Sequence, residues 1–342
     1  MEGVERRDFL KLGLLSTGAL AFRPPEPQTG HPAIGIGRVT VEWIGLYSEP
    51  SFRAPQLIKL TRDTLISLLS RFTSDEGPAH NPAWYAVPEG YVHSGHVQRV
   101  EWRPMPAELH IAPPGALFEI SVPYTRAYRQ PDPASGPLYR LYYQSTAWVT
   151  SALTGVDGRI WYELLDDLLR IRYYARGEHL RHIPLEEVTP ISPEVPLQHK
   201  QIQVDLGSQE LFCYEYKRLV FRTRMSSGIP DSRPRENGIP TITPSGRFFI
   251  EVKMPSRHMG NGRITADLEA YELPGVPWVS FFTPTGVAFH GTYWHNDFGK
   301  PKSRGCINMD CNEAKWLYRW TLPVVSHDQT LRIGRGTPIL IG

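Results

Sequence analysis

The residues best suited to chemistry are a histidine and a cysteine near the carboxyl end of the chain. His290 follows an apolar run at 287–289, and Cys306 lies sixteen positions later, after a loop rich in turn-forming residues. A thiol, with a pKa of about 8.5, is a weak nucleophile, whereas its thiolate is a strong one. Because an imidazole within hydrogen-bonding reach can remove the proton, the pair predicts a cysteine nucleophile with a histidine base that forms an acyl-thioester.

Neighbouring residues complete the predicted site. Gly305 directly precedes the nucleophile, which allows a close approach of substrate and frees a backbone N–H near a developing oxyanion. His295 is a rival base, but we expect it to face substrate or solvent from a flexible loop. Tyr293 and Trp294 are expected to form the wall of the pocket.

A short helix is predicted behind the nucleophile. Asp310 is a suitable N-cap, and Glu313 stands three positions later, where its side chain can reach back to complete a capping box. Cys311 falls in the first turn of this helix, and Cys213 falls in an apolar strand-like run. We therefore assign both of these cysteines to packing, and Cys306 is left as the reactive one.

The domain that must position these residues covers 198–342 and follows a proline-dense joint. Ile202, Val204 and Leu206 alternate with polar residues, as in a strand with one buried face. Residues 254–275, including Met259 to Gly262, interrupt the strand pattern. We interpret this segment as a lid over the cleft, and a plain surface excursion is the alternative.

Two earlier stretches, 33–105 and 106–195, contain short strand-like runs in a similar order. Each has a Trp-Tyr pair near its middle, at 84–85 and at 161–162, which predicts a duplicated module. The two copies resemble bacterial Src-homology-3-like (SH3-like) domains, small bent β-barrels that are attached to cell-wall enzymes. For each Trp taken singly, a place in the core is the simpler interpretation.

The amino terminus has the pattern of an export signal, residues 1–21, followed by a proline-rich linker, residues 22–32. Residues 6–11 (Arg-Arg-Asp-Phe-Leu-Lys) resemble the twin-arginine motif, although Glu5 stands where Ser or Thr is usual. The apolar core at 12–21 is shorter than the ~20 residues that span a bilayer, and Ala-Leu-Ala at 19–21 fits a cleavage site. We expect export to the cell wall, the periplasm or the extracellular space, in a cleaved or an anchored form.

Composition narrows the class of protein. The formal net charge is +2, from 37 Lys and Arg against 35 Asp and Glu, so a nucleic-acid partner is not indicated. The 29 Gly and 32 Pro among short β-prone runs favour a mainly β protein. The cysteines and histidines have no H-E-x-x-H or C-x-x-C spacing, so neither a metal site nor a cofactor is expected.

The segment around Cys306 also resembles a known family. His-Gly-Thr at 290–292, followed by Ser-Arg-Gly-Cys-Ile-Asn-Met at 303–309, is similar to the active-site motif of the YkuD-like L,D-transpeptidases. Thr-Pro-Ser-Gly-Arg-Phe at 243–248 and the closing run at 336–341 are similar to further elements of that family. One departure is Arg304, where the family often has histidine; since arginine cannot act as a base, we expect it to favour the thiolate or hold a substrate carboxylate.

The resemblance implies a mainly β fold with two SH3-like barrels followed by a YkuD-like β-sandwich that has a short helix after the nucleophile. The implied reaction is peptidoglycan cross-linking, in which Cys306 attacks a stem peptide, His290 is the general base, and a second stem supplies the accepting amine. Carbapenem-type β-lactams are implied covalent inhibitors. The carbonyl of Gly291 is expected to orient the imidazole. The predicted pocket comprises Gly291, Tyr293, Trp294, His295, Ser303, Arg304, Gly305 and Asn308.

Two other functions stay open at this point. If water accepts the acyl group, the protein is an L,D-carboxypeptidase that uses the same site. If Arg304 marks a loss of activity, the chain is a cell-wall-binding protein whose SH3-like modules bind glycan or peptide. A papain-type protease is excluded, because its cysteine comes near the mature amino terminus and its histidine later, and this chain has the reverse order.

Overall fold

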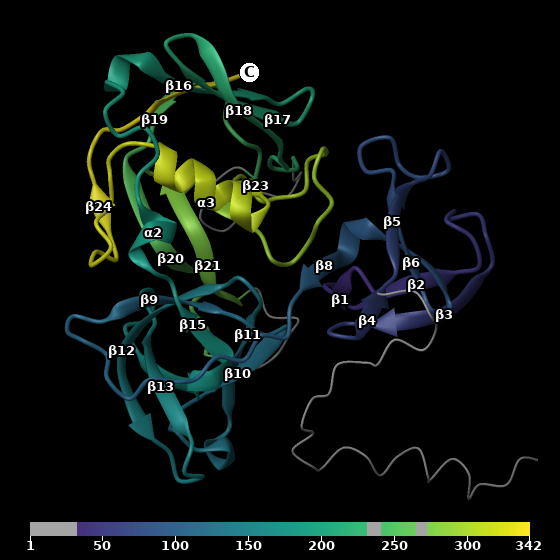
Figure 1. Ribbon diagram of the computed structural model, residues 1–342. Coiled ribbons are helices and arrows are strands. Elements are labelled where there is room, and N and C mark those ends of the chain that lie inside the picture. Colours follow the sequence, from purple (N-terminus) through teal and green to yellow (C-terminus); the bar gives the residue numbers. More distant parts are fainter. Residues whose placement is uncertain (1–32, 231–240, 265–271) are drawn as a thin grey trace, which may run out of the picture.

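The computed structural model describes residues 33–230, 241–264 and 272–342 (Figure 1). Strand content is 46% and helix content 9%, so the expected mainly β class is confirmed. The predicted export signal and linker, residues 1–32, lie outside the described residues. Within the described part of the chain, no helix is long and apolar enough to cross a membrane.

The first module, residues 33–105, places two small antiparallel sheets around one core. Strands from both sheets contribute to that core, for example Leu46 and Leu68. Trp84 and Tyr85 are both buried, which fits the core interpretation of the Trp-Tyr pair. The SH3-like assignment itself stays a prediction. The elements are β1 (Gly35–Val39), β2 (Trp43–Tyr47), β3 (Gln56–Thr61), β4 (Leu65–Leu68), β5 (Ser70–Thr73), β6 (Ala83–Val87), β7 (Gly90–His93), the 3-10 helix η1 (Ser94–His96) and β8 (Val97–Val100).

The second module, residues 106–195, is built on one seven-stranded antiparallel sheet in the order β11-β10-β14-β13-β12-β9-β15. Trp161 and Tyr162 are buried in its fifth strand along the chain. Its elements are β9 (Ala116–Ile120), β10 (Tyr124–Tyr128), η2 (Pro133–Ser135), β11 (Pro137–Tyr142), β12 (Thr146–Thr154), β13 (Ile160–Leu165), β14 (Arg172–Arg176), η3 (Gly177–His179), β15 (Leu180–His182) and α2 (Leu185–Val188).

The carboxyl-terminal domain is a sandwich of two five-stranded sheets with one helix, α3 (Cys311–Trp320). The first sheet has the order β18-β17-β16-β25-β19 and the second has the order β23-β22-β21-β20-β24. The first contains β16 (Lys200–Asp205) after η4 (Leu197–His199), β17 (Glu210–Glu215), β18 (Arg218–Arg224), β19 (Gly246–Phe249) and β25 (Pro338–Ile341). The second contains β20 (Val252–Gly260), β21 (Glu272–Phe281), β22 (Ala288–Gly291), β23 (Ile307–Met309) and β24 (Arg332–Ile333).

One apolar core joins both sheets and α3 in this domain. Ile202 and Val204 come from the first sheet, Phe289 and Ile307 from the second, and Leu317 from the helix. The predicted alternation at 202–206 is therefore confirmed, because its apolar members face this core. Cys213 is in the same core, fully buried, as its assignment to packing requires.

Two buried lysines secure the end of α3. Lys253 donates hydrogen bonds to the carbonyls of Tyr318 (2.6 Å), Thr321 (2.7 Å) and Pro323 (3.0 Å). Lys200 donates to the carbonyl of Trp320 (2.8 Å). Because the last carbonyls of a helix have no partner within it, these ammonium groups satisfy them and fix the helix against both sheets.

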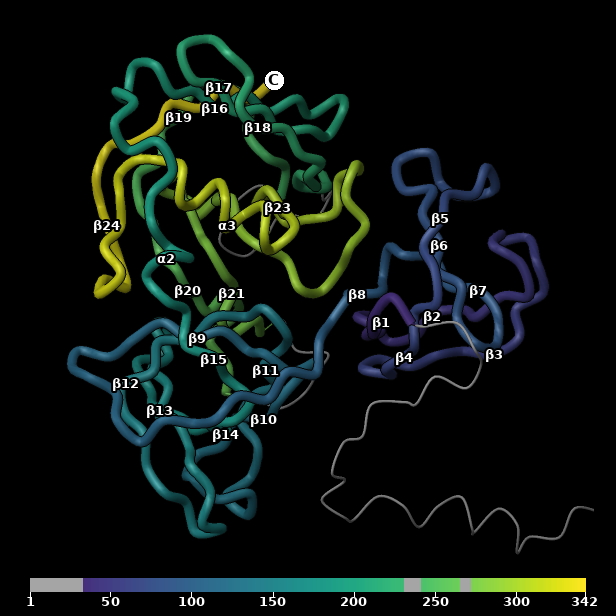
Figure 2. The backbone as a smooth tube through the Cα atoms, viewed as in Figure 1, coloured from purple at the N-terminus to yellow at the C-terminus, as the bar shows by residue number. Residues whose placement is uncertain are grey.

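The expectation that residues 254–275 interrupt the strand pattern is wrong for 254–260 and 272–275, and the part of the predicted lid at 265–271 lies outside the described residues. Residues up to Gly260 continue β20, and β21 resumes at Glu272, so the two strands form a long antiparallel hairpin. Its residues contact the second module, since Thr146 Oγ1 donates to the carbonyl of Pro255 at 2.9 Å. Figure 2 shows this two-stranded hairpin running down from the carboxyl-terminal domain to the second module.

Candidate active site

The candidate base and nucleophile lie on adjacent parallel strands. The register pairs His290 of β22 with Asn308 of β23, and Cys306 stands directly before β23. Phe289 and Ile307 face the main core, so the alternate residues face the other side of the sheet. His290 and Cys306 therefore lie on the same side of the strand pair, where Cys306 packs in one cluster with Ala288 of β22.

The environment of His290 sets both its tautomer and its charge. The side chain is 2% exposed, and Nδ1 lies 3.0 Å from the carbonyl oxygen of Gly291, so Nδ1–H donates to that oxygen. Burial lowers the pKa of His290 to about 4, against the smaller opposing effect of the Gly291 hydrogen bond. The imidazole is neutral near pH 7, and Nε2 carries the lone pair that can accept a proton.

Cys306 differs from the other two cysteines in its exposure. Cys213 and Cys311 are buried, whereas Cys306 is half-buried. The sulfur lies 3.7 Å from the carbonyl oxygen of Gly286. Burial raises the pKa of both buried thiols well above the ordinary value, which keeps them protonated and unreactive.

Gly286, whose carbonyl lies near the sulfur, lines a cavity of about 510 Å³ together with residues of β20, β21 and the second module. Its lining includes both apolar and charged side chains. Its other lining residues are Trp148, Leu165, Asp167, Arg170, Glu251, Val252, Met254, Pro255, Ser256, Arg257, Phe281, Thr283, Pro284, Thr330 and Leu331.

The backbone before the nucleophile is held in a conformation that requires glycine. Gly305 has a φ of +117°, a value that side chains disfavour. Its carbonyl accepts a hydrogen bond from Thr243 Oγ1 at 2.8 Å, and the same hydroxyl oxygen accepts from the backbone N–H of Gly228 at 2.8 Å. A Cβ on Gly228 would lie 2.8 Å from the Cα of Gly305, so these two segments can approach each other only with glycine at that position.

The N–H of Gly305 is not free, contrary to expectation. It donates to Ser303 Oγ at 3.2 Å, and the Ser303 hydroxyl in turn donates to the carbonyl of Cys306. Ser303 therefore closes the turn around the nucleophile. Arg304, between them, is exposed at the surface.

His295 is buried, and the expectation of a solvated or substrate-facing side chain is wrong. It is 4% exposed; its Nδ1 accepts from the backbone N–H of Asp297 at 3.3 Å, and its Nε2 lies 2.9 Å from the side-chain amide of Asn308. Both ring nitrogens are therefore occupied. Burial, with a further contribution from Lys302, lowers the pKa of His295 well below its usual value.

The two aromatic residues before His295 have different places. Trp294 packs near the imidazole of His290, with ring centroids 5.6 Å apart. Tyr293 does not form a pocket wall as expected, because it is 1% exposed and its ring packs against Tyr142 of the second module. Its hydroxyl donates to the carbonyl of Pro274 at 3.0 Å.

The helix behind the nucleophile begins as predicted, with one difference. The Asp310 side chain accepts from the backbone N–H of Asn312 at 2.8 Å and of Glu313 at 3.4 Å, so it is the N-cap. Glu313 does not complete a capping box; its carboxylate accepts from the Thr223 hydroxyl instead. A Cβ on Gly291 would lie 3.1 Å from the Cα of Cys311, so the close packing of α3 on β22 depends on this glycine.

Several residues of the site were not identified as such from the sequence. Thr243 and Gly228 support Gly305, and Asp297 lies in the loop between the base and the nucleophile. The resemblance at 243–248 marked the threonine as part of a motif but gave no contact for it. Among the described residues, no group of three His, Cys, Asp or Glu side chains is arranged to hold a metal ion.

Comparison with known proteins matches this part of the chain. Residues 199–341 match the family model YkuD, the L,D-transpeptidase catalytic domain. A curated relative, the putative L,D-transpeptidase YciB of Bacillus subtilis (strain 168), is 23% identical over 136 residues, which are 37% of this chain and 63% of the relative.

Solved structures are similar over the same share of the chain. An L,D-transpeptidase from Mycobacterium smegmatis is 22% identical with a TM-score of 0.32, and the match covers 42% of this chain and 58% of that one. The catalytic domain of the E. faecium L,D-transpeptidase is 26% identical with a TM-score of 0.31, and 42% of this chain and 96% of that one are covered.

The fold and the family model together assign the carboxyl-terminal domain. Residues 199–341 are a YkuD-type L,D-transpeptidase catalytic domain. The parallel pair β22 and β23 is the part of this domain that brings His290 and Cys306 to one face.

Proposed function

We propose that the protein is a peptidoglycan L,D-transpeptidase in which Cys306 is the nucleophile and His290 the general base. The observation that carries the proposal is the neutral imidazole of His290, with Nδ1–H held by Gly291, on the same sheet face as the half-buried thiol. That tautomer leaves Nε2 as the nitrogen that takes the thiol proton.

The reaction proceeds in two halves. In the first, the Cys306 thiol gives its proton to His290 Nε2, and the sulfur attacks the carbonyl carbon of the third residue of a tetrapeptide stem. The C–N bond to the terminal D-Ala breaks, and the D-Ala amine leaves with the proton from the imidazolium. The product of this half is an acyl-thioester on Cys306.

In the second half, the side-chain amine of another stem attacks the thioester. His290 accepts a proton from the attacking nitrogen, the C–S bond breaks, and the proton returns to the sulfur. A 3→3 cross-link leaves, and the thiol is restored. If water attacks instead, the product is a tripeptide, and the enzyme is an L,D-carboxypeptidase.

The cavity beside Gly286 is the proposed place of the acyl donor. Because its lining mixes apolar and charged side chains, it suits a peptide with a charged side-chain terminus. Arg304 is proposed to hold a substrate carboxylate, since this exposed arginine stands two positions before the nucleophile in the chain. The substrate lies outside the cytoplasm, so the proposal includes export through the amino-terminal signal, with binding of wall glycan or peptide by the first two modules.

Muropeptide mass spectrometry tests the proposed function. Incubation of the full chain with a tetrapeptide stem should give a cross-linked dimer, and the Cys306→Ala variant should give none. The Cys311→Ser variant is the control, because that thiol is buried behind β22. A trimmed tripeptide without dimer would support the carboxypeptidase, and unchanged substrate would reject both enzymes in favour of a wall-binding protein.

A further inference from the structure

The loop between the candidate base and nucleophile, residues 292–305, here called the catalytic loop, is contacted from outside its own domain. We propose that the first module positions the catalytic loop, with Arg38 as the positioning residue. The inference rests on the proposed function, because it concerns how the same site is assembled.

Arg38 reaches the catalytic loop from strand β1. It is 2% exposed, and its Nη2 donates to the backbone carbonyl of Tyr293 at 2.8 Å. Tyr293 stands three positions after His290, so this hydrogen bond fixes the loop close to the imidazole. The acceptor is a main-chain oxygen and the donor comes from residue 38, so the contact joins two segments 255 positions apart in the chain.

Arg38 donates three further hydrogen bonds. Nη1 pairs with Asp63 Oδ1 at 2.8 Å, while Nε and Nη2 both donate to Gln98 Oε1, at 3.1 and 2.7 Å. The guanidinium also lies over the ring of Tyr142, 4.1 Å from its centroid. A charge this deeply buried is tolerated only with such partners, so its orientation toward Tyr293 is strongly determined.

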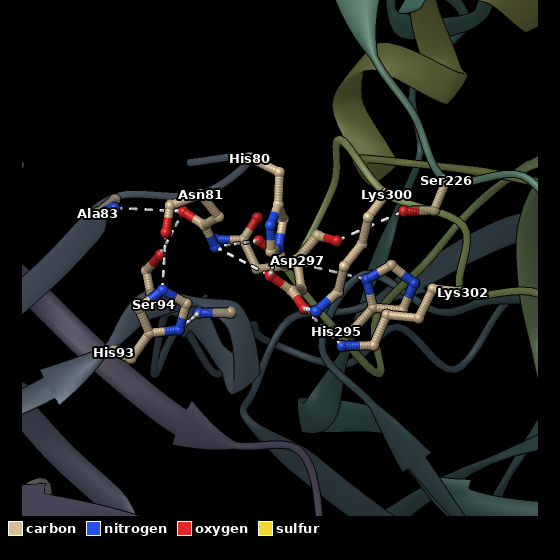
Figure 3. A network of polar contacts seen from close by, with 12 residues as sticks. His80, Asn81, Ala83, His93, Ser94, Ser226, His295, Asp297, Lys300 and Lys302 are labelled. Carbon is tan, nitrogen blue, oxygen red and sulfur yellow. Dashed lines mark hydrogen bonds and ion pairs between the residues drawn. The ribbon is translucent and has the colours of Figure 1, made fainter. Parts of the chain in front are cut away.

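The other half of the catalytic loop is held through Asp297, which Figure 3 shows in the middle of a polar network. Its Oδ1 lies 2.9 Å from His80 Nε2 of the first module. Its Oδ2 pairs with Lys300 and Lys302, both at 2.9 Å. Hydrogen bonds with these two lysines and with His80 outweigh the effect of burial and lower the pKa of Asp297 far below its usual range.

Further contacts place the first module directly on the loop backbone. The N–H of Asn296 donates to the carbonyl of Gly95 at 2.9 Å. Lys302 donates to His96 Nε2 at 3.1 Å. A Cβ on Gly95 would lie 2.9 Å from Asp297 Oδ1, so the two segments meet without room for a side chain.

The geometry of these contacts indicates that they position the catalytic loop. The catalytic loop is rich in turn-forming residues, and the register of β22 with β23 fixes only its two ends. From the first module, hydrogen bonds reach the loop at Tyr293, Asn296, Asp297 and Lys302. They add to contacts from the loop's own domain, in which the N–H groups of Gly299 and Lys302 donate to the carbonyls of Met225 and Ser227. A nucleophile and base must be held closely to react, and a misplacement of about 1 Å can lower a rate a hundredfold.

The experiment compares two arginines that share one carboxylate. Arg38 and Arg140 both pair with Asp63, but of the two only Arg38 has a hydrogen bond to the catalytic loop among the contacts described. Full-length Arg38→Gln and Arg140→Gln are therefore matched variants. Carbapenem acylation is followed over a range of drug concentrations, which separates the saturating rate from the half-saturating concentration, and hydrogen exchange is measured across residues 292–302.

We expect Arg38→Gln to lower the saturating acylation rate roughly ten- to a hundredfold, with little change in the half-saturating concentration, and to increase exchange across 292–302. Arg38→Lys should recover part of the rate, because an ammonium can donate to the Tyr293 carbonyl. Arg140→Gln should stay within about threefold of the unaltered protein, since it does not touch the loop.

Four results would overturn the proposal. One is an unchanged saturating rate in folded Arg38→Gln, and another is an equal loss in Arg140→Gln. If Arg38→Gln does not fold, Gly95→Ala replaces it, because the added Cβ displaces Asp297 without removing the buried charge of Arg38. An unchanged acylation rate in Gly95→Ala would also overturn the proposal. If the unaltered protein forms no adduct, the proposed function fails. Hydrogen exchange then tests the positioning of the catalytic loop by itself, and no rise in exchange across 292–302 in Arg38→Gln would overturn the positioning proposal.

Discussion

Two buried histidines, one in β22 and one in the β20–β21 hairpin, have the same exposure, but their pKa values are shifted in opposite directions. His290 and His258 are each 2% exposed. The polar partner of His290 is a backbone carbonyl, and burial lowers the pKa of His290 to about 4. For His258, burial also opposes the charge, but hydrogen bonds to Asp166 (2.7 Å) and Glu272 (2.9 Å) outweigh it and raise the pKa.

The difference shows that partners, and not burial alone, set the protonation state. A neutral imidazole suits β22, where we propose that it accepts a proton from a thiol. A raised pKa favours the charged imidazole in the hairpin, where His258 joins Asp166 of the second module to Glu272 of the carboxyl-terminal domain. One histidine therefore fits a catalytic role, and the other fits a structural connection between modules.

The largest expected effect is the loss of the base. We expect His290→Ala to lower the rate of carbapenem acylation by roughly 10² to 10⁴, because Cys306 then ionises without an adjacent proton acceptor. Stopped-flow or mass-spectrometric rates measure this effect. His295→Ala is the control. If His295→Ala stops acylation while His290→Ala leaves it unchanged, the base is His295 and the assignment to His290 is wrong.

A second change breaks the charged histidine's environment. Asp166→Asn should destabilise the protein by about 3–5 kcal/mol, because it removes one partner from a buried ion pair. Urea unfolding measures the loss. Arg159→Gln is a matched surface change, since the Arg159–Glu178 pair is exposed, and it should cost little. Equal losses for the two variants would show that His258 is not a charged connection.

The two histidines should also respond to pH in opposite ways. The folded pKa of His258 lies above 6.5, so its contribution to stability is present below pH 6.5 and decreases as the pH rises through the folded value. The folded pKa of His290 is about 4, so its contribution is present above pH 6.5 and decreases as the pH falls toward 4.

Unfolding free energies and acylation rates between pH 4 and 9 separate these effects. Replacement of His258 by Gln should flatten the alkaline side of the stability profile and leave the acylation profile unchanged. Acylation in the unaltered protein should persist down to about pH 5, because His290 is still neutral there. An acylation rate that falls with a midpoint near 6.5 would mean that the His290 imidazole is not shielded as described.

The smallest expected effect involves neither histidine. Asp310→Ala should cost about 1 kcal/mol, the usual contribution of an N-cap, and should leave both pH profiles in place. Thermal unfolding at pH 7 measures it. A shift of either pH profile in this variant would show that α3 controls the histidine environments. The different pKa values of His290 and His258 would then not be set by their own partners alone.

Local patterns predicted the parts of the molecule that depend on local contacts. The alternation at Ile202 and Val204, the N-cap at Asp310 and the packing of Cys213 follow from neighbours within a few positions, and the structure confirms them. Residue types alone singled out Cys306 and His290 as a pair. Their catalytic roles stay predictions.

Contacts between distant segments could not be predicted in this way. Tyr293 and His295 are polar-tipped residues in a turn-rich loop, which favours exposure, but both are buried. Tyr293 packs against Tyr142 of the second module, and His295 binds Asn308, thirteen positions later. Glu313 has the spacing of a capping box, yet Thr223, ninety positions earlier, binds it instead. Arg38 has no local pattern that indicates a role, because its acceptor lies 255 positions away.

Peptide mapping of the intact protein after reaction with a carbapenem is the sharpest test of whether Cys306 is the nucleophile. We expect a single added drug mass on the peptide that contains Cys306, retained in Cys311→Ser and absent in Cys306→Ala. An adduct that persists in Cys306→Ala, or that maps to another residue of the unaltered protein, would contradict it.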